Sequence, residues 1–430
     1  MILLQPNNLK SGRLFVTTAA DPNPNKFPAL ISVAQNSFTC QRCQMTNSRQ
    51  VYWLPSHVYY CPHCIGLGRL TSQDWLVAYP EVNAFAPVAK PLAWQGTLTS
   101  AQRQVAGELC QVWRQQGEHL VWAVTGSGKT EMLFPMLQQA VLHRDRIALA
   151  APRIDVCTEL YPRIQAAFPG VSCGLLYGSG QLKYQYTQIL VCTVHQLLKF
   201  RQAFDVLVLD ECDSFPYLNN PMLHAAVKQA VKPHRTLIYL SATPSLEYQQ
   251  RIQQQQLNYS LLNRRFHGHD LPVPRYQTVG FGKTITTNWT LQQHLKKLVQ
   301  QQQRFLLFVP SIASSEKISR QLTYVLPTLS QNFVHAKDPQ RVAKVAAFRR
   351  GHWQALITTT VLERGVSFDD IDVIVWQADN ERFNMQTLVQ IAGRAGRSAQ
   401  YSNNQVTFYG RKYTRAIQQA ITTIIELNHG

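Results

Sequence analysis

The chain has 430 residues, 45% of them hydrophobic, which excludes a disordered protein and favours two or three packed domains. It contains no apolar run of about 18 residues and no basic, apolar leader, so the sequence predicts a cytoplasmic protein without a membrane span. Lys and Arg number 42 against 24 Asp and Glu, and from Asn263 onward 21 basic residues face 10 acidic ones. This balance suits a polyanionic partner such as nucleic acid, but it is equally compatible with an ordinary basic surface.

Residues 1–94 form the first predicted domain and contain two Cys-x-x-Cys pairs, in a segment of about 38–68. Seventeen residues separate the pairs, which is the spacing of a four-thiolate Zn²⁺ site: Cys40, Cys43, Cys61 and Cys64. Four sulfurs complete a tetrahedron, so the site is predicted to be structural, with His63 as an additional candidate ligand. The other cysteines occur singly, as buried thiols do: Cys110, Cys157, Cys173, Cys192 and Cys212.

Basic and aromatic side chains are interleaved with the paired cysteines: Arg42, Arg49, Trp53, Tyr59 and Tyr60. They suit stacking on unpaired bases. In so small a domain they equally suit packing beneath the metal, and the sequence leaves both interpretations open. After this domain, Pro80 and the Ala-Pro-Val-Ala-Lys-Pro stretch that ends at Pro91 predict a linker.

From Thr97 onward, short apolar segments alternate with helical ones, which predicts α/β lobes with parallel sheets covered on both faces. The first lobe is expected to span 95–260, with helices over 129–142 and 154–167 and strands at His119–Val124, Arg146–Ala150, Ile189–Cys192, Val206–Leu209 and Thr236–Leu240. The pattern restarts in a second lobe, 261–430, with strands at Arg304–Val309, Asn332–His335, Ala355–Thr358, Val373–Trp376 and Gln405–Tyr409.

Residues 123–130, Ala-Val-Thr-Gly-Ser-Gly-Lys-Thr, lie between a predicted strand and a predicted helix, which is the setting of a phosphate-binding loop. The two glycines let backbone N–H groups approach the phosphates of ATP, and the helix N-terminus attracts negative charge. Lys129 is expected to reach the β- and γ-phosphates, and Thr130 to ligate Mg²⁺. Ala123 stands where the general motif has its first glycine. The expected nucleotide contacts are Thr125, Gly126, Ser127, Gly128, Lys129 and Thr130.

Asp210 and Glu211 follow the predicted strand Val206–Leu209. Carboxylates at the C-terminal end of a strand in an open parallel sheet face the ligand crevice. We expect Asp210 to hold Mg²⁺ through water, and Glu211 to orient or deprotonate the attacking water. The next predicted strand ends in Ser241-Ala242-Thr243, which either couples the nucleotide to the second lobe or caps a helix before Pro244.

The segment 390–397, Gln-Ile-Ala-Gly-Arg-Ala-Gly-Arg, follows a strand of the second lobe. Arg394 and Arg397 are three residues apart and are therefore expected on one helix face. In that position they are predicted to act as arginine fingers on the γ-phosphate. Whether they act within one chain or between the chains of a homo-oligomer remains open.

Seven such segments occur in an order that resembles helicase superfamily 2, the DEAD-box-like group, over about 95–430. The resemblance implies two RecA-like lobes, a glutamine, Gln102, that reads adenine, and a nucleotide site that includes Gly365 and Gln390. Residues of Ala151-Pro152-Arg153, Thr193-Val194-His195-Gln196 and Thr358–Val366 resemble the nucleic-acid-contacting motifs. The contacts implied are Arg153, Thr193, His195, Thr358 and Thr359.

A four-cysteine domain in front of such a motor makes the whole chain similar to the ComFA family, the competence ATPases of Gram-positive bacteria. The resemblance also rests on Pro152–Val156, Glu159-Leu160 and the Asp-Glu-x-Asp box. It implies ATP hydrolysis stimulated by single-stranded DNA during uptake of transforming DNA. It further implies the partners ComFC, ComEC and DprA, and a peripheral location at the inner face of the cell membrane.

Three other functions would also use parts of this sequence. A replication-restart helicase of the PriA kind also carries cysteine zinc sites, but there the cysteines interrupt the motor lobes, whereas here they precede Thr97. An RNA helicase would be activated by RNA. A non-hydrolysing zinc-ribbon protein would bind nucleic acid without turnover, although the retained Lys129, Asp210 and Glu211 argue against it.

Overall fold

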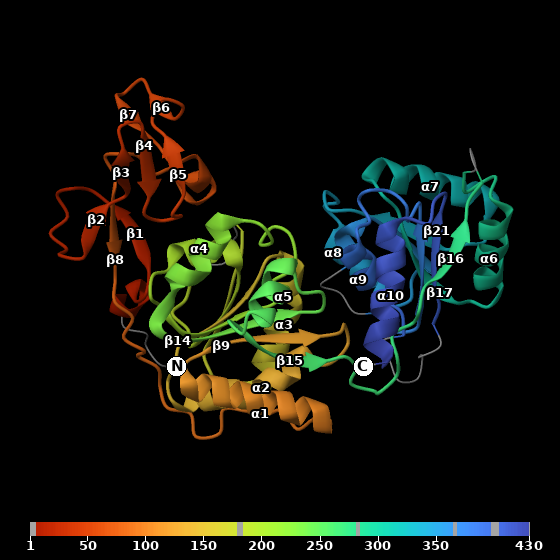
Figure 1. The fold of residues 1–430 in the computed structure, drawn as a ribbon, viewed down its shortest axis with the longest axis horizontal. Coiled ribbons are helices and arrows are strands. Elements are labelled where there is room, and N and C mark those ends of the chain that lie inside the picture. The colour runs from red at the N-terminus through yellow and green to blue at the C-terminus, as the bar shows by residue number, and fades with distance from the viewer. Residues whose placement is uncertain (1–5, 179–183, 281–283, 364–367, 397–403, 430) are drawn as a thin grey trace. The chain divides into compact units, whose positions relative to one another are not determined.

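The computed structural model describes residues 6–178, 184–280, 284–363, 368–396 and 404–429. The chain divides into two compact units, one made of Met1–Val121 with Thr130–Ser260 and the other of Trp122–Lys129 with Leu261–Gly430. Each unit contains a sheet with helices packed against it, and the first unit also carries small N-terminal sheets (Figure 1). The predicted fold class, two α/β lobes behind a small cysteine-containing domain, is confirmed. Among the described residues, no helix is both long and apolar enough to cross a membrane.

The first unit contains a seven-stranded sheet, as far as the described residues show, in the order β11-β12-β10-β13-β14-β9-β15. The central strands β10 and β12 pair in parallel and are buried at every residue, because helices lie on both faces. Figure 1 shows α1 and α2 on one face and α4 on the other. The strands are β9 (Glu118–Ala123), β10 (Ile147–Ala151), β11 (Cys173–Leu176), β12 (Ile189–Thr193), β13 (Phe204–Leu209), β14 (Val231–Ser241) and β15 (Asn258–Leu262), and the helices are α1 (Ser100–Gln115), α2 (Lys129–Leu142), α3 (Ile154–Ala167), η3 (Val194–Lys199), α4 (Pro221–Ala230) and α5 (Leu246–Gln253).

The second unit is built on a sheet in the order β16-β21-β20-β17-β19-β18, in which each strand pairs in parallel with its neighbours. Alternate residues of each strand enter different cores: Leu306 and Phe308 pack with α9 and α10, whereas Phe305 and Leu307 pack with α6 and α7. The strands are β16 (Arg275–Thr278), β17 (Arg304–Phe308), β18 (Gln331–Val334), β19 (Ala355–Thr358), β20 (Ile371–Trp376) and β21 (Val406–Gly410), and the helices are α6 (Trp289–Gln300), α7 (Ile312–Val325), α8 (Arg341–Arg349), η4 (Thr360–Leu362), α9 (Met385–Ala392) and α10 (Arg415–His429).

The N-terminal domain consists of short strands that the sequence pattern does not reveal. They form the sheets β1-β8-β2, β3-β4-β5 and β6-β7. None of them is longer than five residues, which is too short for a clear two-residue alternation. The elements are η1 (Pro6–Lys10), β1 (Leu14–Thr17), β2 (Lys26–Pro28), β3 (Leu30–Ala34), β4 (Ser37–Cys40), β5 (Thr46–Ser48), β6 (Trp53–Leu54), β7 (Val58–Tyr59), η2 (Pro62–Leu67) and β8 (Trp75–Ala78).

Backbone hydrogen bonds attach this domain to the first lobe. The N–H of Arg201, beyond η3, donates to the carbonyl of Gly12 at 3.0 Å, and the N–H of Ala93 donates to the carbonyl of Ala167 at 2.8 Å. Within the domain, the N–H of Gly12 donates to the carbonyl of Tyr79 at 3.0 Å. Gly12 has a φ of 68°, and a Cβ at this position would lie 2.6 Å from the Cβ of Ala203. Only glycine therefore allows the two backbones to approach so closely.

The segment predicted as a linker begins with a buried anchor instead. The carboxylate of Glu81 forms an ion pair with the guanidinium of Arg146, and both side chains are fully buried. Arg146 also donates to the carbonyl of Ser11 at 3.0 Å, and Tyr186 donates to Glu81. A buried charge requires a nearby partner, so Glu81 and Arg146 stay together. This pair fixes the first residues after Pro80 against the start of β10.

Candidate functional site

The phosphate-binding loop lies between β9 and α2, as its sequence predicts. Gly126 and Gly128 adopt φ values of 84° and 77°, a region that favours glycine. Lys129 and Thr130 open α2, so they stand where the N-terminus of the helix attracts anions. Ala123 is the last residue of β9 and is buried, so this position belongs to the strand, where a Cβ is tolerated.

The structure brings Thr130 and Asp210 together. Both line a small cavity whose other walls are apolar residues of α2, β10, α3, β13 and β14. The N–H of Asp210 donates to the carbonyl of Ala150 at 2.8 Å, which extends the sheet hydrogen bonding past the end of β13. A hydroxyl and a carboxylate supply hard oxygen ligands, which are the donor type that Mg²⁺ takes.

Glu211 occupies an unusual backbone conformation beside this pair. Its φ is 51°, in the left-handed region, and its N–H donates to Oδ1 of Asp210 at 2.8 Å. The hydrogen bond holds the Asp210 carboxylate in position. Glu211 is not a glycine, so its conformation carries local strain, as is common at functional sites.

The Ser241-Ala242-Thr243 segment contacts the acidic box, which is the Asp-Glu-x-Asp segment of residues 210–213. The hydroxyl of Thr243 donates to Oδ2 of Asp213 at 2.5 Å, and the N–H of Thr243 donates to the hydroxyl of Ser241 at 3.0 Å. The helix that follows, α5, takes Ser245 as its N-cap residue. The capping interpretation of the segment is therefore wrong, and its hydroxyls instead link the ends of β13 and β14.

Gln102 lies in the first turn of α1. Its Oε1 accepts from the N–H of Thr99 at 2.8 Å, while the N–H of Gln102 donates to the hydroxyl of Thr99 at 3.2 Å. This reciprocal pair is a capping box, which fixes the N-terminus of the helix. The side chain therefore has a structural role in addition to the adenine contact that the resemblance implies.

The candidate strand-binding residues of the first lobe lie at the carboxyl ends of neighbouring strands. Arg153 follows β10 and approaches Asp155 at 3.5 Å, and Thr193 ends β12 in register with Ala151. His195 lies in η3, where burial lowers its pKa, so it is neutral at pH 7.

In the second unit, only one of the two candidate threonines faces outward. Thr358 ends β19, is fully buried and donates through its hydroxyl to the carbonyl of Thr359 at 3.1 Å. Thr358 has no exposed surface to offer a nucleic-acid strand. Thr359 is partly exposed, so it is the member of the pair that remains available.

Arg394 is predicted to lie on a helix face, but in the structure it lies outside helix α9. Helix α9 ends at Ala392 with Gly393 as its C-cap, and Arg394 lies in the turn that follows. Its side chain is 2% exposed and donates through Nε and Nη2 to the carbonyl of Glu363 at 2.9 and 2.6 Å. Gln390 is buried in α9, while Gly365 and Arg397 lie outside the described residues.

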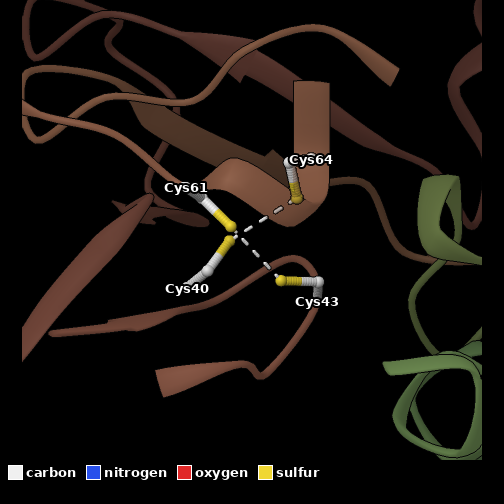
Figure 2. A group of neighbouring side chains, drawn as sticks. All are labelled: Cys40, Cys43, Cys61 and Cys64. Atoms are coloured by element: carbon white, nitrogen blue, oxygen red, sulfur yellow. Dashed lines mark hydrogen bonds between the residues drawn. The ribbon is translucent and has the colours of Figure 1, made fainter. Parts of the chain in front are cut away.

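The four paired cysteines converge on one point. Figure 2 shows their sulfurs pointing toward a common centre, and all four ligand atoms lie within 4.8 Å of one another. The Sγ–Sγ distances are 3.7 Å for Cys40–Cys64 and 3.5 Å for Cys43–Cys61. Zinc–sulfur bonds of about 2.3 Å place tetrahedral sulfurs about 3.8 Å apart, so the donor set fits Zn²⁺. His63, the additional candidate, is not in this cluster.

Arg42 belongs to this metal-binding cluster and not to a base-stacking surface. It is buried, and its Nε donates to Sγ of Cys64 at 3.3 Å. The remaining guanidinium nitrogens donate to the carbonyls of Cys64, Leu67 and Gly68. A Zn²⁺ ion with four thiolates carries a charge of about −2, and a buried guanidinium offsets part of it.

The single cysteines are reduced thiols, and all except the partly exposed Cys173 are buried. Cys157 lies in α3 near the acidic box, where burial raises its pKa to about 12. It therefore stays protonated at neutral pH and adds no charge near Asp210.

Comparison with known proteins places this chain in a family. It is 37% identical over 428 residues to the competence protein ComFA of Streptococcus pneumoniae, covering 97% of each chain. The chain belongs to the ComFA family. It is also 35% identical over 405 residues to the ComFA protein of Bacillus subtilis, covering 93% of this chain and 87% of the relative.

Two protein-family models also match parts of this ComFA-family chain. Residues 95–246 match the type III restriction enzyme res subunit model, and residues 289–399 match the helicase conserved C-terminal domain model. Dbp5 of S. cerevisiae, solved with RNA and ADP BeF3, shares the fold at a TM-score of 0.55 and 16% identity, covering 77% of this chain and 91% of Dbp5. The chain is therefore an ATP-hydrolysing enzyme of helicase superfamily 2 that binds nucleic acid.

The sequence motifs did not identify Arg265 of this ComFA-family chain, because Arg265 lies in none of them. It is buried and donates to the carbonyls of Ala395 and Gly393 at 2.7 and 3.2 Å, and also to that of Gly396. It thereby bonds carbonyl groups of the turn that follows α9, and it holds this turn, which carries Arg394. A lone arginine in a polar segment gives no sequence signal, because its partners are 128–131 residues away.

Proposed function

We propose that this chain is an ATP-driven translocase on single-stranded DNA that powers the uptake of transforming DNA. The observation that carries the proposal is the meeting of Thr130 and Asp210 at one cavity, directly beside Glu211. Membership of the ComFA family supports the process, because the relatives are competence proteins. The excess of Lys and Arg supports an anionic partner.

In the proposed site, Lys129 binds the β- and γ-phosphates, and Glu211 orients and deprotonates the attacking water. Thr130 and Asp210 would hold Mg²⁺, which supplies charge neutralisation at the phosphates. Arg394 and Arg397 would stabilise charge on the γ-phosphate. Domains at 1–94, 95–260 and 261–430 are retained as proposed boundaries, and the strand contacts as proposed roles of Arg153, Thr193, His195 and Thr359.

The proposal extends to cofactors, partners and location. Zn²⁺ is assigned to the four cysteines, whose geometry fits it. ComFC, ComEC and DprA are proposed partners, which would place the chain at the inner face of the cell membrane. They rest on family membership alone.

Single-stranded DNA is expected to stimulate ATP hydrolysis, and Lys129→Ala to lower the stimulated turnover about 10²- to 10³-fold, the cost of one preorganised charge-stabilising donor. Lys228→Ala is the matched control, because Lys228 is exposed on α4 and should change turnover little. Streptavidin blocks at either end of the DNA then test movement, since a translocase displaces only one of them. Stimulation by RNA alone, or displacement of neither block, would contradict the proposal.

Zinc affinity is expected to depend on Arg42. Arg42→Met keeps the apolar length of the side chain but removes the donor to Cys64, so affinity should fall roughly 10- to 100-fold, as for other residues that contact metal ligands. Competition with a chromogenic chelator measures this directly. Arg69→Met is the control, because Arg69 is exposed. Equal affinities for the two variants would refute the role of Arg42.

A further inference from the structure

The N-terminal domain presents a stack of aromatic rings at its surface. Trp53 in β6 faces Tyr59 in β7, with ring centroids 6.4 Å apart and an angle of 25° between the rings. Tyr59 packs in turn on the buried Phe38, at 4.8 Å. Trp53 is the outermost ring and remains 49% exposed. The stack is thus anchored in the core at one end and open to solvent at the other.

This arrangement separates the two interpretations that the sequence left open. Phe38 and Arg42 are buried, and Arg42 donates a hydrogen bond to Cys64 of the metal-binding cluster. Trp53 does not pack beneath the metal, since half of its surface is in contact with water. A large, rigid ring that is half exposed is suited to stack on a planar ligand.

Charge around the stack favours an anion. Arg49 lies over the ring of Tyr59, 5.0 Å from its centroid, and its Nη2 donates to the hydroxyl of Ser32. Between Asp21 and Asp74 the sequence contains four basic residues and no Asp or Glu. Arg42 is buried at the cysteines, and Lys26 donates to the carbonyls of Ala19 and Asp21, which leaves Arg49 and Arg69 to act on a partner. A protein partner with an acidic surface would meet the charge but would not need an exposed ring.

We propose that Trp53, supported on its inner side by Tyr59, stacks on an unpaired base of single-stranded DNA, with Arg49 beside the flanking phosphate. This inference rests on the proposed function for the identity of the strand. It adds a strand-binding site outside the two lobes, on the domain that carries the cysteines. Stacking accepts every base, so the site would bind DNA without sequence preference.

Trp53→Ala in the full-length chain is expected to weaken binding of a labelled oligo-dT strand about 5- to 150-fold, the range for losing one base–aromatic stack. Fluorescence anisotropy without nucleotide gives the dissociation constant. Trp53→Phe should restore most of the affinity, because it keeps a ring. Trp289→Ala is the matched control: Trp289 is 73% exposed, but it lies on α6 of the other unit.

Two further measurements keep the outcomes distinct. Zinc content should equal that of the unmodified chain, which shows that the domain is folded. Iododeoxyuridine photocrosslinking on the unmodified chain should label Trp53 or Tyr59. An unchanged dissociation constant for Trp53→Ala, or crosslinks only in the lobes, would overturn the site. A chain whose ATPase ignores single-stranded DNA would instead contradict the proposed function.

Discussion

Replacing Glu211 by glutamine is expected to lower the kcat of DNA-stimulated ATP hydrolysis about 10²- to 10⁴-fold, the contribution of a positioned general base. Glutamine has nearly the same shape but cannot accept the proton of the attacking water. The backbone N–H of residue 211 still donates to Asp210, so the metal-binding carboxylate should keep its position. Affinity for a fluorescent ATP analogue is therefore expected to change little, and kcat to carry the loss.

Glu131→Gln is the matched control for this experiment. Glu131 lies in the first turn of α2, close to the phosphate loop, but its carboxylate pairs with Arg163 at a partly exposed position. Its kcat should stay within about twofold of the unmodified enzyme, since exposed pairs contribute little. A Glu211→Gln enzyme that keeps more than about a tenth of the kcat would exclude Glu211 as the base.

Glu81→Gln is expected to lower the free energy of opening between the N-terminal domain and the first lobe by about 3–5 kcal/mol, because it leaves the Arg146 guanidinium buried without its counter-charge. Hydrogen exchange of peptides that contain Arg201 measures this opening, since the backbone N–H of Arg201 donates to the carbonyl of Gly12 across the junction. Both side chains are fully buried, so solvent screens the pair very little.

A second variant separates the charge effect from a general loss of packing. Arg146→Met in the Glu81→Gln background removes the uncompensated charge and should recover part of the lost stability. The surface variant Glu131→Gln should cost no more than about 1 kcal/mol. If Glu81→Gln leaves exchange at the junction unchanged, the ion pair does not hold the domain.

The lobes could be predicted closely because their signals are local. Helices α2 and α3 begin and end where the sequence predicts, and the phosphate loop and the acidic box lie at strand ends as expected. Buried parallel strands appear as apolar runs, and their order along the chain is enough to define an α/β lobe. The roles of Lys129, Asp210 and Glu211 remain predictions.

The remaining features depend on contacts that sequence periodicity does not encode. Glu81 lies in a proline-containing stretch, and its partner Arg146 is 65 residues away. Arg42 resembled a surface base-binding residue, but its position beside Cys64 buries it. Arg394 was expected on a helix, yet α9 ends at Ala392 with Gly393 as its C-cap. In each case, burial decided the role of a charged side chain.

The pairing of β1 with β8 brings the two ends of the cysteine-bearing segment next to each other. Leu14 pairs with Ala78 and Thr17 with Trp75, so the chain enters and leaves the cysteine-bearing domain on adjacent antiparallel strands. A segment whose ends lie about 5 Å apart can be exchanged as a cassette without rerouting the rest of the chain. The segment between β1 and β8 can therefore be replaced while Gly12, Glu81 and Arg146 keep the attachment to the first lobe.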